Sequence, residues 1–427
     1  MNINADNSAP PPKGARVVVG MSGGVDSSVA AYLLKQQGCE VIGVTMKVWP
    51  QDCLSRAEDK CCGPQAIADA RSVAHALGIP HYVVDESENF ERAVIDYFTA
   101  EYKAGRTPNP CVMCNEKVKF GNLWGKAKAI GADYIATGHY AIVEHRQVAA
   151  TPSSQLAAPP PRSENCRRTL GGEGPAMFGG EGAAATLGRE GAAAVRAVLR
   201  KGVDSRKDQS YFLFSLRQAQ LLRALLPLGR MEKTEIRVIA RQLGLKTADK
   251  EDSQEICFVP GNDYKAFLKS HMDAKEFHPG GIYDKQGRRV AEHDGIELFT
   301  IGQRKGLPGG SAKPMYVIDI DPATSSVIVG AAEDLVTGEF TIDHCTWHGD
   351  AIAPFDATVK IRYAHPGVAA TVFPGENGEA RVQLRVPQRA VTPGQAAVCY
   401  RGDEVLGGGW ITRQAAVAPA QVAALAV

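Results

Sequence analysis

The chain has 427 residues, of which 44% are hydrophobic and 22% are charged, and its formal net charge is only +1. At ~150 residues per domain, this length predicts two or three domains. A nearly neutral charge excludes a basic field over the whole surface, so a nucleic-acid partner would be held by local patches. No apolar run approaches the roughly 20 residues of a membrane span, and the proline-rich start contains no secretory signal. Because the ten cysteines are scattered along the chain, we expect a soluble, cytoplasmic protein rather than a disulfide-framed secreted one.

The first part of the chain alternates short β-branched runs with helical patterns, from ARVVVG, which begins at residue 15, to ADYIATGHYA, which ends at residue 141. This alternation predicts an α/β fold with a parallel, doubly wound sheet. We place this domain at residues 14–268, after a flexible tail at 1–13. Residues 146–195 are rich in glycine, alanine and proline without apolar periodicity, which predicts a flexible insertion.

The pattern changes twice after the insertion. DQSYFLFSLRQAQLLRALL and KTEIRVIARQLGL have helical spacing, and DYKAFLKSH predicts a shorter helix. Beyond Pro279, short alternating segments are separated by Gly, Pro and Asp turns, which predicts antiparallel β structure. We place a small central β-rich domain at residues 269–333 and a C-terminal antiparallel β-barrel at 334–420.

The segment GMSGGVDS lies where the first predicted strand ends and the first helix begins. Glycines there allow a close backbone approach, successive N–H groups form an anion nest, and the helix N-terminus adds its dipole. The segment lacks the Gly-Lys-Ser/Thr of a Walker A motif and the Gly-x-Gly-x-x-Gly of a dinucleotide fold. The predicted phosphate-binding residues are Gly20, Met21, Ser22, Gly23, Gly24, Val25, Asp26 and Ser27. The alternative is an ordinary glycine-rich turn with Asp26 or Ser27 as the helix cap.

Three cysteines stand out from the rest. Cys111 and Cys114 form a CxxC pair on a proline-stiffened loop before a helix that we expect to start near Asn115, where the helix dipole would lower a thiol pKa. Cys257 lies in an irregular segment after a charged stretch. Alone, the pair could be half a zinc site, a redox dithiol or two packed cysteines, and the absence of a second CxxC or a His pair weakens the zinc interpretation.

The glycine-rich segment resembles the pyrophosphate loop of the PP-loop ATP pyrophosphatases, which have an adenine nucleotide alpha hydrolase-like fold and cleave ATP to AMP and pyrophosphate. Seven segments in order closely resemble the tRNA-specific 2-thiouridylases: SGGVDSS, GRTPNPCVMCNEKVKFG, TGHYA, KDQSYFL, DSQEICF, TIGQRKGL and GQAAVCYRGDEVLGGGWI. The resemblance covers nearly the whole chain except the N-terminal tail, the insertion and the last few residues. It implies that ATP, with Mg²⁺, adenylates the C2 oxygen of a tRNA wobble uridine and that a protein persulfide then delivers sulfur to C2.

The resemblance also assigns roles to the cysteines. Cys114 matches the catalytic nucleophile, and Cys257 matches the cysteine that receives a persulfide from a sulfur-relay protein or a cysteine desulfurase. The two would be left as a transient disulfide that a reductant reopens, which requires Cα atoms ~4.4 to 6.8 Å apart.

Other matched residues would contact ATP or tRNA. Met46 and Gly138 would flank the adenosine, although core packing is the ordinary use of a methionine. Asn109, Pro110 and Cys111 match the segment that meets the target base, which must leave its stack. The matched tRNA-contacting residues are Lys207, Asp208, Gln209, Arg362 and Tyr363. A local basic cluster would bind phosphates or form a solvated charged face, and it comprises Arg196, Arg200, Lys201, Arg206 and Lys207. We interpret His139 as structural.

This chain departs from the family pattern in two places. Cys111 replaces an aspartate that some members carry and that has been proposed as a general base. Together with Cys114 and Cys257, it could ligate three irons of a [4Fe–4S] cluster, but the motifs follow the persulfide family and we prefer that route. The insertion, which contains Cys166, replaces a short connection, so its deletion over 150–190 should leave thiolation intact.

Some interpretations remain open. A second group, Cys53, Cys61 and Cys62, suggests a mobile loop that closes over the site. Rival functions are another PP-loop synthetase that adenylates a small carboxylate or carbonyl, and a non-catalytic tRNA-binding scaffold in which the cysteines merely pack.

Overall fold

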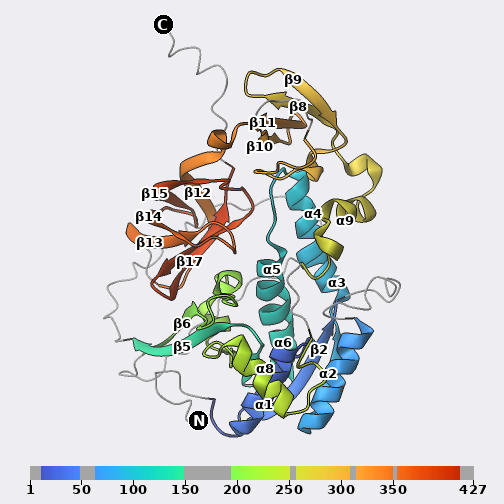
Figure 1. The fold of residues 1–427 in the computed structure, drawn as a ribbon. Coiled ribbons are helices and arrows are strands. Elements are labelled where there is room, and N and C mark those ends of the chain that lie inside the picture. Colours follow the sequence, from blue (N-terminus) through green and yellow to red (C-terminus); the bar gives the residue numbers. More distant parts are fainter. Residues whose placement is uncertain are drawn as a thin grey trace, which may run out of the picture.

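The computed structural model describes residues 11–48, 63–148, 194–250, 256–307, 314–349 and 353–413. Cys53, Cys61, Cys62, Cys166 and most of the predicted tail and insertion lie outside these residues. Figure 1 shows an α/β part at the bottom of the view, with a barrel and a small sheet above it. Within the described part of the chain, no helix is long and apolar enough to cross a membrane.

A five-stranded sheet, in the order β3-β2-β1-β4-β7, forms the N-terminal domain, and its strand pairs are parallel, as predicted. The strands are β1 (Arg16–Gly20), β2 (Glu40–Lys47), β3 (His81–Asp85), β4 (Tyr134–Ala136) and β7 (Ala224–Leu225). The chain runs outward from β1 to β3 and then returns to the other side of β1 with β4. This reversal makes the carboxyl ends of β1 and β4 the expected ligand crevice.

The two faces of this sheet bury different partners. Val17 and Val19 of β1 share a core with the helices α1 (Val25–Gln36), α2 (Pro64–Leu77) and α8 (Lys233–Gln242). Val18, which points to the opposite face, shares a core with Phe120 and Leu123. This arrangement follows from the strand alternation, because successive side chains leave a strand on opposite faces.

Phe120 and Leu123 belong to a continuous helical run, residues 110–129, that we call the cysteine helix. It comprises α5 (Pro110–Met113), the π-type segment η3 (Cys114–Leu123) and α6 (Trp124–Ala129). The helix therefore begins before Cys111 and not near Asn115 as predicted, because Pro110 suits the first helical position, where its missing N–H costs nothing. Before it, the chain forms α3 (Ser87–Phe90), η2 (Glu91–Ile95) and α4 (Asp96–Lys103).

The region between the insertion and α8 differs from the prediction. Residues 208–226 form only the short helices η4 (Ser210–Leu213) and α7 (Gln218–Leu221) and the strand β7, not long helices. Most apolar side chains of η4 and of the turn after it are buried in the core that the sheet domain shares with the barrel, namely Tyr211, Leu213, Phe214 and Leu216. Because they are buried on several sides, they do not form the single apolar face of a long helix. A hairpin, β5 (Ala141–Val148) and β6 (Ala194–Lys201), extends a few residues into the predicted insertion at both ends.

The C-terminal barrel is antiparallel, as predicted, and closes through the pairing of β12 with β17. Its strands are β12 (Val336–Trp347), β13 (Phe355–Lys360), β14 (Val368–Pro374), β15 (Ala380–Arg389), β16 (Ala396–Arg401) and β17 (Glu404–Ile411). The hairpin extends this sheet, because Glu404 pairs with Arg200. Val398 and Tyr400 of the barrel share one core with Val18 of the parallel sheet, so the barrel and the N-terminal domain are packed together.

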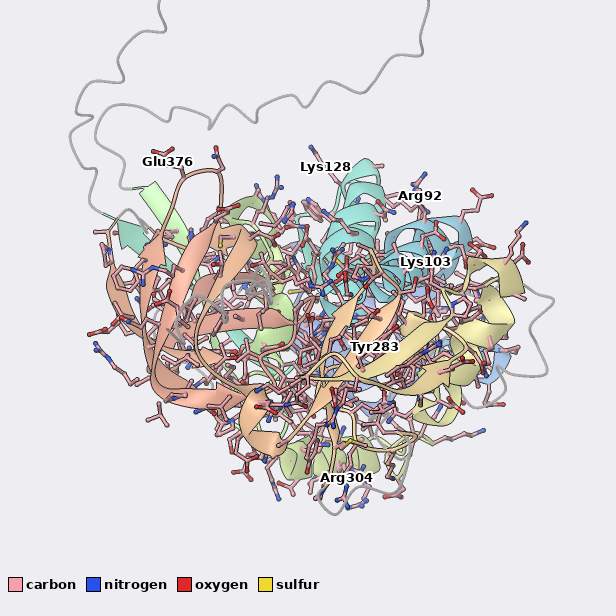
Figure 2. All side chains as sticks on the ribbon, turned by 90° about the horizontal axis from the view of Figure 1, so that it is seen from above. Arg92, Lys103, Lys128, Tyr283, Arg304 and Glu376 are labelled. Carbon is pink, nitrogen blue, oxygen red and sulfur yellow. The ribbon has the colours of Figure 1, made fainter. Side chains whose placement is uncertain are left out.

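The central domain is a four-stranded sheet in the order β10-β11-β8-β9. Its elements are β8 (Gly280–Asp284), β9 (Arg289–His293), η7 (Ile296–Leu298), β10 (Tyr316–Asp321), β11 (Ser326–Gly330) and η8 (Ala332–Leu335). The connection from α8 contains η5 (Pro260–Asn262), α9 (Tyr264–His271), as predicted, and η6 (Ala274–Glu276). Lys103 of α4 reaches Glu276 at 2.7 Å, and Figure 2 shows Lys103 beside the sheet that carries Tyr283.

Candidate functional site

The segment of residues 20–27, which we call the phosphate loop, joins β1 to α1. Gly24 occupies the N-cap of α1 in an extended conformation, with no side-chain cap on the helix. Ser27 fastens the loop instead, because its Oγ accepts from Ser22 N at 3.1 Å and donates to Gly24 O at 3.3 Å. The N–H groups of a helix's first turn have no intrahelical acceptor, so this end of α1 can receive an anion.

Two glycines are required by close backbone contacts at this loop. Gly23 has a φ of +69°, and a Cβ there would lie 2.3 Å from Ala66 O. A Cβ on Gly138 would lie 2.7 Å from Ser27 N. Gly138 follows β4, so the structure brings the predicted adenosine-flanking segment against the phosphate loop. Met46 is half-buried against the surrounding cores, and its contact with ATP stays a prediction.

Two residues that no sequence pattern marked hold Asp26. Both carboxylate oxygens of Asp26 accept from Lys233 Nζ, at 2.7 and 2.8 Å, and Tyr140 OH donates to Asp26 Oδ1 at 2.6 Å. Lys233 is only 7% exposed, and its backbone N–H donates to Asp204 at 3.1 Å. The helical pattern of KTEIRVIARQ placed Lys233 at a helix start, and a lysine there is usually exposed. Only the tertiary structure therefore identifies it as a site residue.

The cysteine helix lies against the same segment. Phe120 and His139 have ring centroids 6.2 Å apart, and Thr137 Oγ1 lies 2.6 Å from His139 Nδ1. Burial, with the charge of Lys119 nearby, holds the pKa of His139 well below its ordinary value, which agrees with a structural role. The charge of Lys119, which no sequence pattern marked, also acts on Cys111.

Cys111 of the CxxC pair differs from the prediction in one respect. Burial raises the pKa of Cys111 to about 11, with a further rise from Cys114 and an opposing effect of Lys119. The expected lowering by the helix dipole is therefore wrong for Cys111, because desolvation of the thiolate outweighs it. Cys111 is poorly suited to act as a base or nucleophile near neutral pH.

Cys114 and Cys257, which are distant in sequence, pack against one aromatic core that includes Phe90, Phe98 and Phe258. The structure thus brings the two predicted sulfur-handling residues to the same cluster, while their disulfide stays a prediction. Among the residues that the structure describes, no three His, Cys, Asp or Glu side chains are grouped to hold a metal ion. Cys111, Cys114 and Cys257 are therefore not arranged as cluster ligands, and the [4Fe–4S] interpretation gains no support.

Hydrogen bonds to backbone N–H groups fix two side chains of the predicted tRNA-contacting segment. Asp208 is 6% exposed and accepts from Gly202 N and Ser210 N, both at 3.1 Å. Gln209 Oε1 accepts from Tyr140 N at 3.0 Å. These two side chains shape the segment, and their contact with tRNA stays a prediction, as does that of Lys207.

The barrel adds an exposed aromatic and basic surface beside this segment. Tyr363 is 37% exposed, and its ring centroid lies 4.5 Å from that of Phe212. Lys360 Nζ lies 5.6 Å from the Tyr363 ring centroid. Arg362, next to it, is exposed. An aromatic ring with cations around it is suited to nucleobases and phosphates.

The predicted basic cluster is partly structural. Arg200, together with Arg146 and Arg230, forms ion pairs with Glu144, which is 9% exposed. Lys201 Nζ lies 4.5 Å from the ring centroid of Tyr400. Arg206 also pairs with a carboxylate, since its Nε lies 3.8 Å from Asp204 Oδ1, but its side chain is 79% exposed and remains suited to a phosphate.

Three parts of the chain match known family models. Residues 15–160 and 179–261 match the tRNA methyl transferase HUP domain, residues 265–331 the tRNA methyl transferase PRC-barrel domain, and residues 337–411 the aminomethyltransferase beta-barrel domain. The chain is 42% identical to a tRNA-specific 2-thiouridylase of Clostridium tetani, over 93% of this chain and 98% of that protein. A protein of the same description from Caldanaerobacter subterraneus is 46% identical, again over 93% and 98%. One from Heliobacterium modesticaldum is 43% identical, over 93% and 92%.

Proposed function

The chain belongs to the tRNA-specific 2-thiouridylase family, and on this premise we propose that it converts a tRNA wobble uridine to 2-thiouridine. The observation that carries the proposal is the contact between the two halves of the site. Gly138 packs on Ser27 of the phosphate loop, and the next residue, His139, packs on Phe120 of the cysteine helix. An activating loop and a sulfur-handling helix thus flank one short segment.

In the first step, the uridine C2 oxygen attacks the α-phosphorus of ATP, and pyrophosphate leaves. The backbone N–H groups at the start of α1 would stabilise the charge of the phosphates. Mg²⁺ would enter with ATP. Because both oxygens of Asp26 already bind Lys233, we assign Mg²⁺ to the phosphates rather than to this carboxylate.

In the second step, the outer sulfur of a Cys257 persulfide attacks C2, and AMP leaves with the former C2 oxygen. The Cys114 thiolate attacks the inner sulfur, so the S–S bond of the persulfide breaks and a Cys114–Cys257 disulfide forms. The two electrons that reduce the transferred sulfur come from the two cysteines, and an external thiol reductant restores them. Asn109, Pro110 and Cys111 would meet the flipped base, and the surface around Arg362 and Tyr363 would bind the tRNA.

The substrate and donor explain where the protein would work. A tRNA and a persulfide-carrying protein, either a relay protein or a cysteine desulfurase, are both cytoplasmic reactants, so we propose a cytoplasmic location. Thiol reduction there would reopen the disulfide.

The test is an anaerobic reaction of the purified protein with ATP, Mg²⁺, unmodified tRNA and a persulfide donor, followed by nucleoside mass spectrometry. We expect 2-thiouridine from the wild type and none from Cys114→Ser or Cys257→Ser, with AMP formation retained in both variants. AMP without any thiolated nucleoside in the wild type would favour another adenylating synthetase. Binding of tRNA without ATP turnover would favour the scaffold.

A further inference from the structure

The barrel holds the segment that leads into the cysteine helix. Gln395, in the turn before β16, donates from Nε2 to Thr107 O and to Pro108 O, both at 3.1 Å. Thr107 and Pro108 lie 288 and 287 positions before Gln395 in the sequence, so this contact joins the N-terminal domain to the barrel. A single carboxamide therefore binds two consecutive carbonyls just ahead of Cys111.

The sequence of this segment explains why it needs such a partner. In Thr-Pro-Asn-Pro, residues 107–110, both prolines lack a backbone N–H, and each restricts the residue before it to extended conformations. The segment cannot join a regular hydrogen-bond ladder, yet buried carbonyls must find donors. Gln395 supplies them.

Further contacts make the same turn a rigid support. Thr107 N donates to Pro393 O at 2.8 Å. Gly394 has a φ of +86°, and a Cβ there would lie 2.9 Å from both Arg106 Cβ and Thr107 O. The turn is itself anchored to β17, because Ile411 N donates to Gln395 O at 2.8 Å and Gly394 N donates to Ile411 O at 2.9 Å.

Tyr211 forms a second bridge between the barrel turn and the helix entrance. Its OH donates to Ala396 O, one residue after Gln395, at 2.9 Å. Its side chain also forms a hydrogen bond with Asn109, which offsets part of the rise that burial causes in the pKa of Tyr211. Asn109 is the residue immediately before the cysteine helix. The barrel turn therefore contacts the helix entrance through Gln395 directly and through Tyr211.

We propose that Gln395 is a positioning residue that sets the entry of the cysteine helix and thereby the placement of Cys111 and Cys114. This inference rests on the proposed function. Sulfur transfer needs the reacting atoms aligned, and a misplacement of about 1 Å can cost ~100-fold in rate. Tyr363 packs on Phe212 and its ring centroid lies 6.1 Å from that of Tyr211, whereas Gln395 binds the carbonyls of Thr107 and Pro108, so losing the Gln395 bonds should slow the transfer step without weakening tRNA binding.

The test compares Gln395→Met, which keeps the side-chain length but removes both donors, with Gln383→Met. Gln383 is exposed on β15 of the same barrel and serves as the matched control. In single-turnover reactions with persulfide-loaded enzyme, we expect thiolation by Gln395→Met to be about 10- to 100-fold slower. The tRNA dissociation constant should stay within about twofold of the wild type. Gln383→Met should match the wild type in every readout.

Hydrogen exchange separates this inference from the proposed function. Gln395→Met should exchange faster over residues 109–116 at an unchanged melting temperature, whether or not the wild type makes 2-thiouridine. Unchanged exchange there, or wild-type thiolation by Gln395→Met, would overturn the positioning role. A tRNA affinity that falls in step with the rate would also overturn it, since the effect would then be one on binding. A wild type that makes no 2-thiouridine would defeat the proposed function alone.

Discussion

The phosphate loop and the cysteine helix stand side by side but are supported by different parts of the chain. The loop is held within the N-terminal domain: Met21 N donates to Val44 O at 2.8 Å, Thr45 Oγ1 donates to Met21 O at 2.8 Å, and Lys233 holds Asp26. The entrance of the cysteine helix is held by Pro393 and Gln395 of the barrel.

This difference separates the two halves of the chemistry. On the proposed function, ATP activation would depend on contacts that form within one parallel-sheet unit. Sulfur handling would depend on the barrel as well, because residues from the C-terminal part of the chain hold the entrance of the cysteine helix. Perturbations should therefore affect one half more than the other.

The largest effect is expected from Lys233→Met. It leaves the Asp26 carboxylate uncompensated beside the phosphates, so AMP formation should fall by about 100-fold or more. Because Asp26 is about one-third exposed, the loss of unfolding free energy should be only about 2 kcal/mol, less than for a fully buried pair. The double variant Asp26→Asn/Lys233→Met should recover most of that stability in a denaturant titration. If AMP formation stays normal, the loop does not depend on this pair.

The thiol of Cys111 should react slowly because its pKa is raised to about 11. At pH 8, alkylation by iodoacetamide should be roughly 100-fold slower than for an exposed cysteine, since only the thiolate reacts. The rate should continue to rise up to about pH 11. Peptide mass spectrometry of a pH series measures it. A plateau near pH 9 would show that burial does not raise the pKa of Cys111.

Acid should weaken the junction of the barrel with the N-terminal domain. His348 is 3% exposed and lies beside the Phe214 backbone and the Arg196 side chain, and burial lowers its pKa to about 4. Between this value and ~6.5, the unfolded chain binds a proton that the folded chain does not, so stability falls as the pH falls through this range. The loss from His348 is at most about 3 kcal/mol and is complete below about pH 4.

The measurement is the unfolding free energy as a function of pH for the wild type and His348→Leu. The variant should show a shallower decline below pH 6.5, because it lacks the titrating group. Equal slopes of unfolding free energy against pH in the two proteins would mean that folding does not lower the pKa of His348.

The smallest effect is expected from deleting residues 150–190. Val148 and Ala194 are opposite each other in the β5–β6 hairpin, so a short turn can close it. The family match also omits residues 161–178. Thiolation and melting temperature should stay close to wild-type values, because shortening a loop changes its closure entropy only slightly. A large loss of thiolation would show that the insertion takes part in the reaction.

The sequence was most informative where structure is local. The strand, glycine loop and helix from Arg16 to Gln36 are contiguous, and their alternating and periodic patterns predicted both the parallel sheet and the phosphate loop. The order of short β segments predicted the barrel. The same reasoning failed for residues 208–226, where an apolar run that is buried on several sides has no single helical face to detect.

By itself, the sequence determined the fold class, the phosphate loop, the family and the cysteines that carry the proposed chemistry, because these depend on neighbouring residues or on motifs. Only the tertiary structure decided that Lys233 holds Asp26, that burial raises the pKa of Cys111, and that Gln395 supports the entry of the cysteine helix. Burial and hydrogen bonding between residues more than two hundred positions apart leave no periodic trace in the chain, since each depends on how whole domains pack.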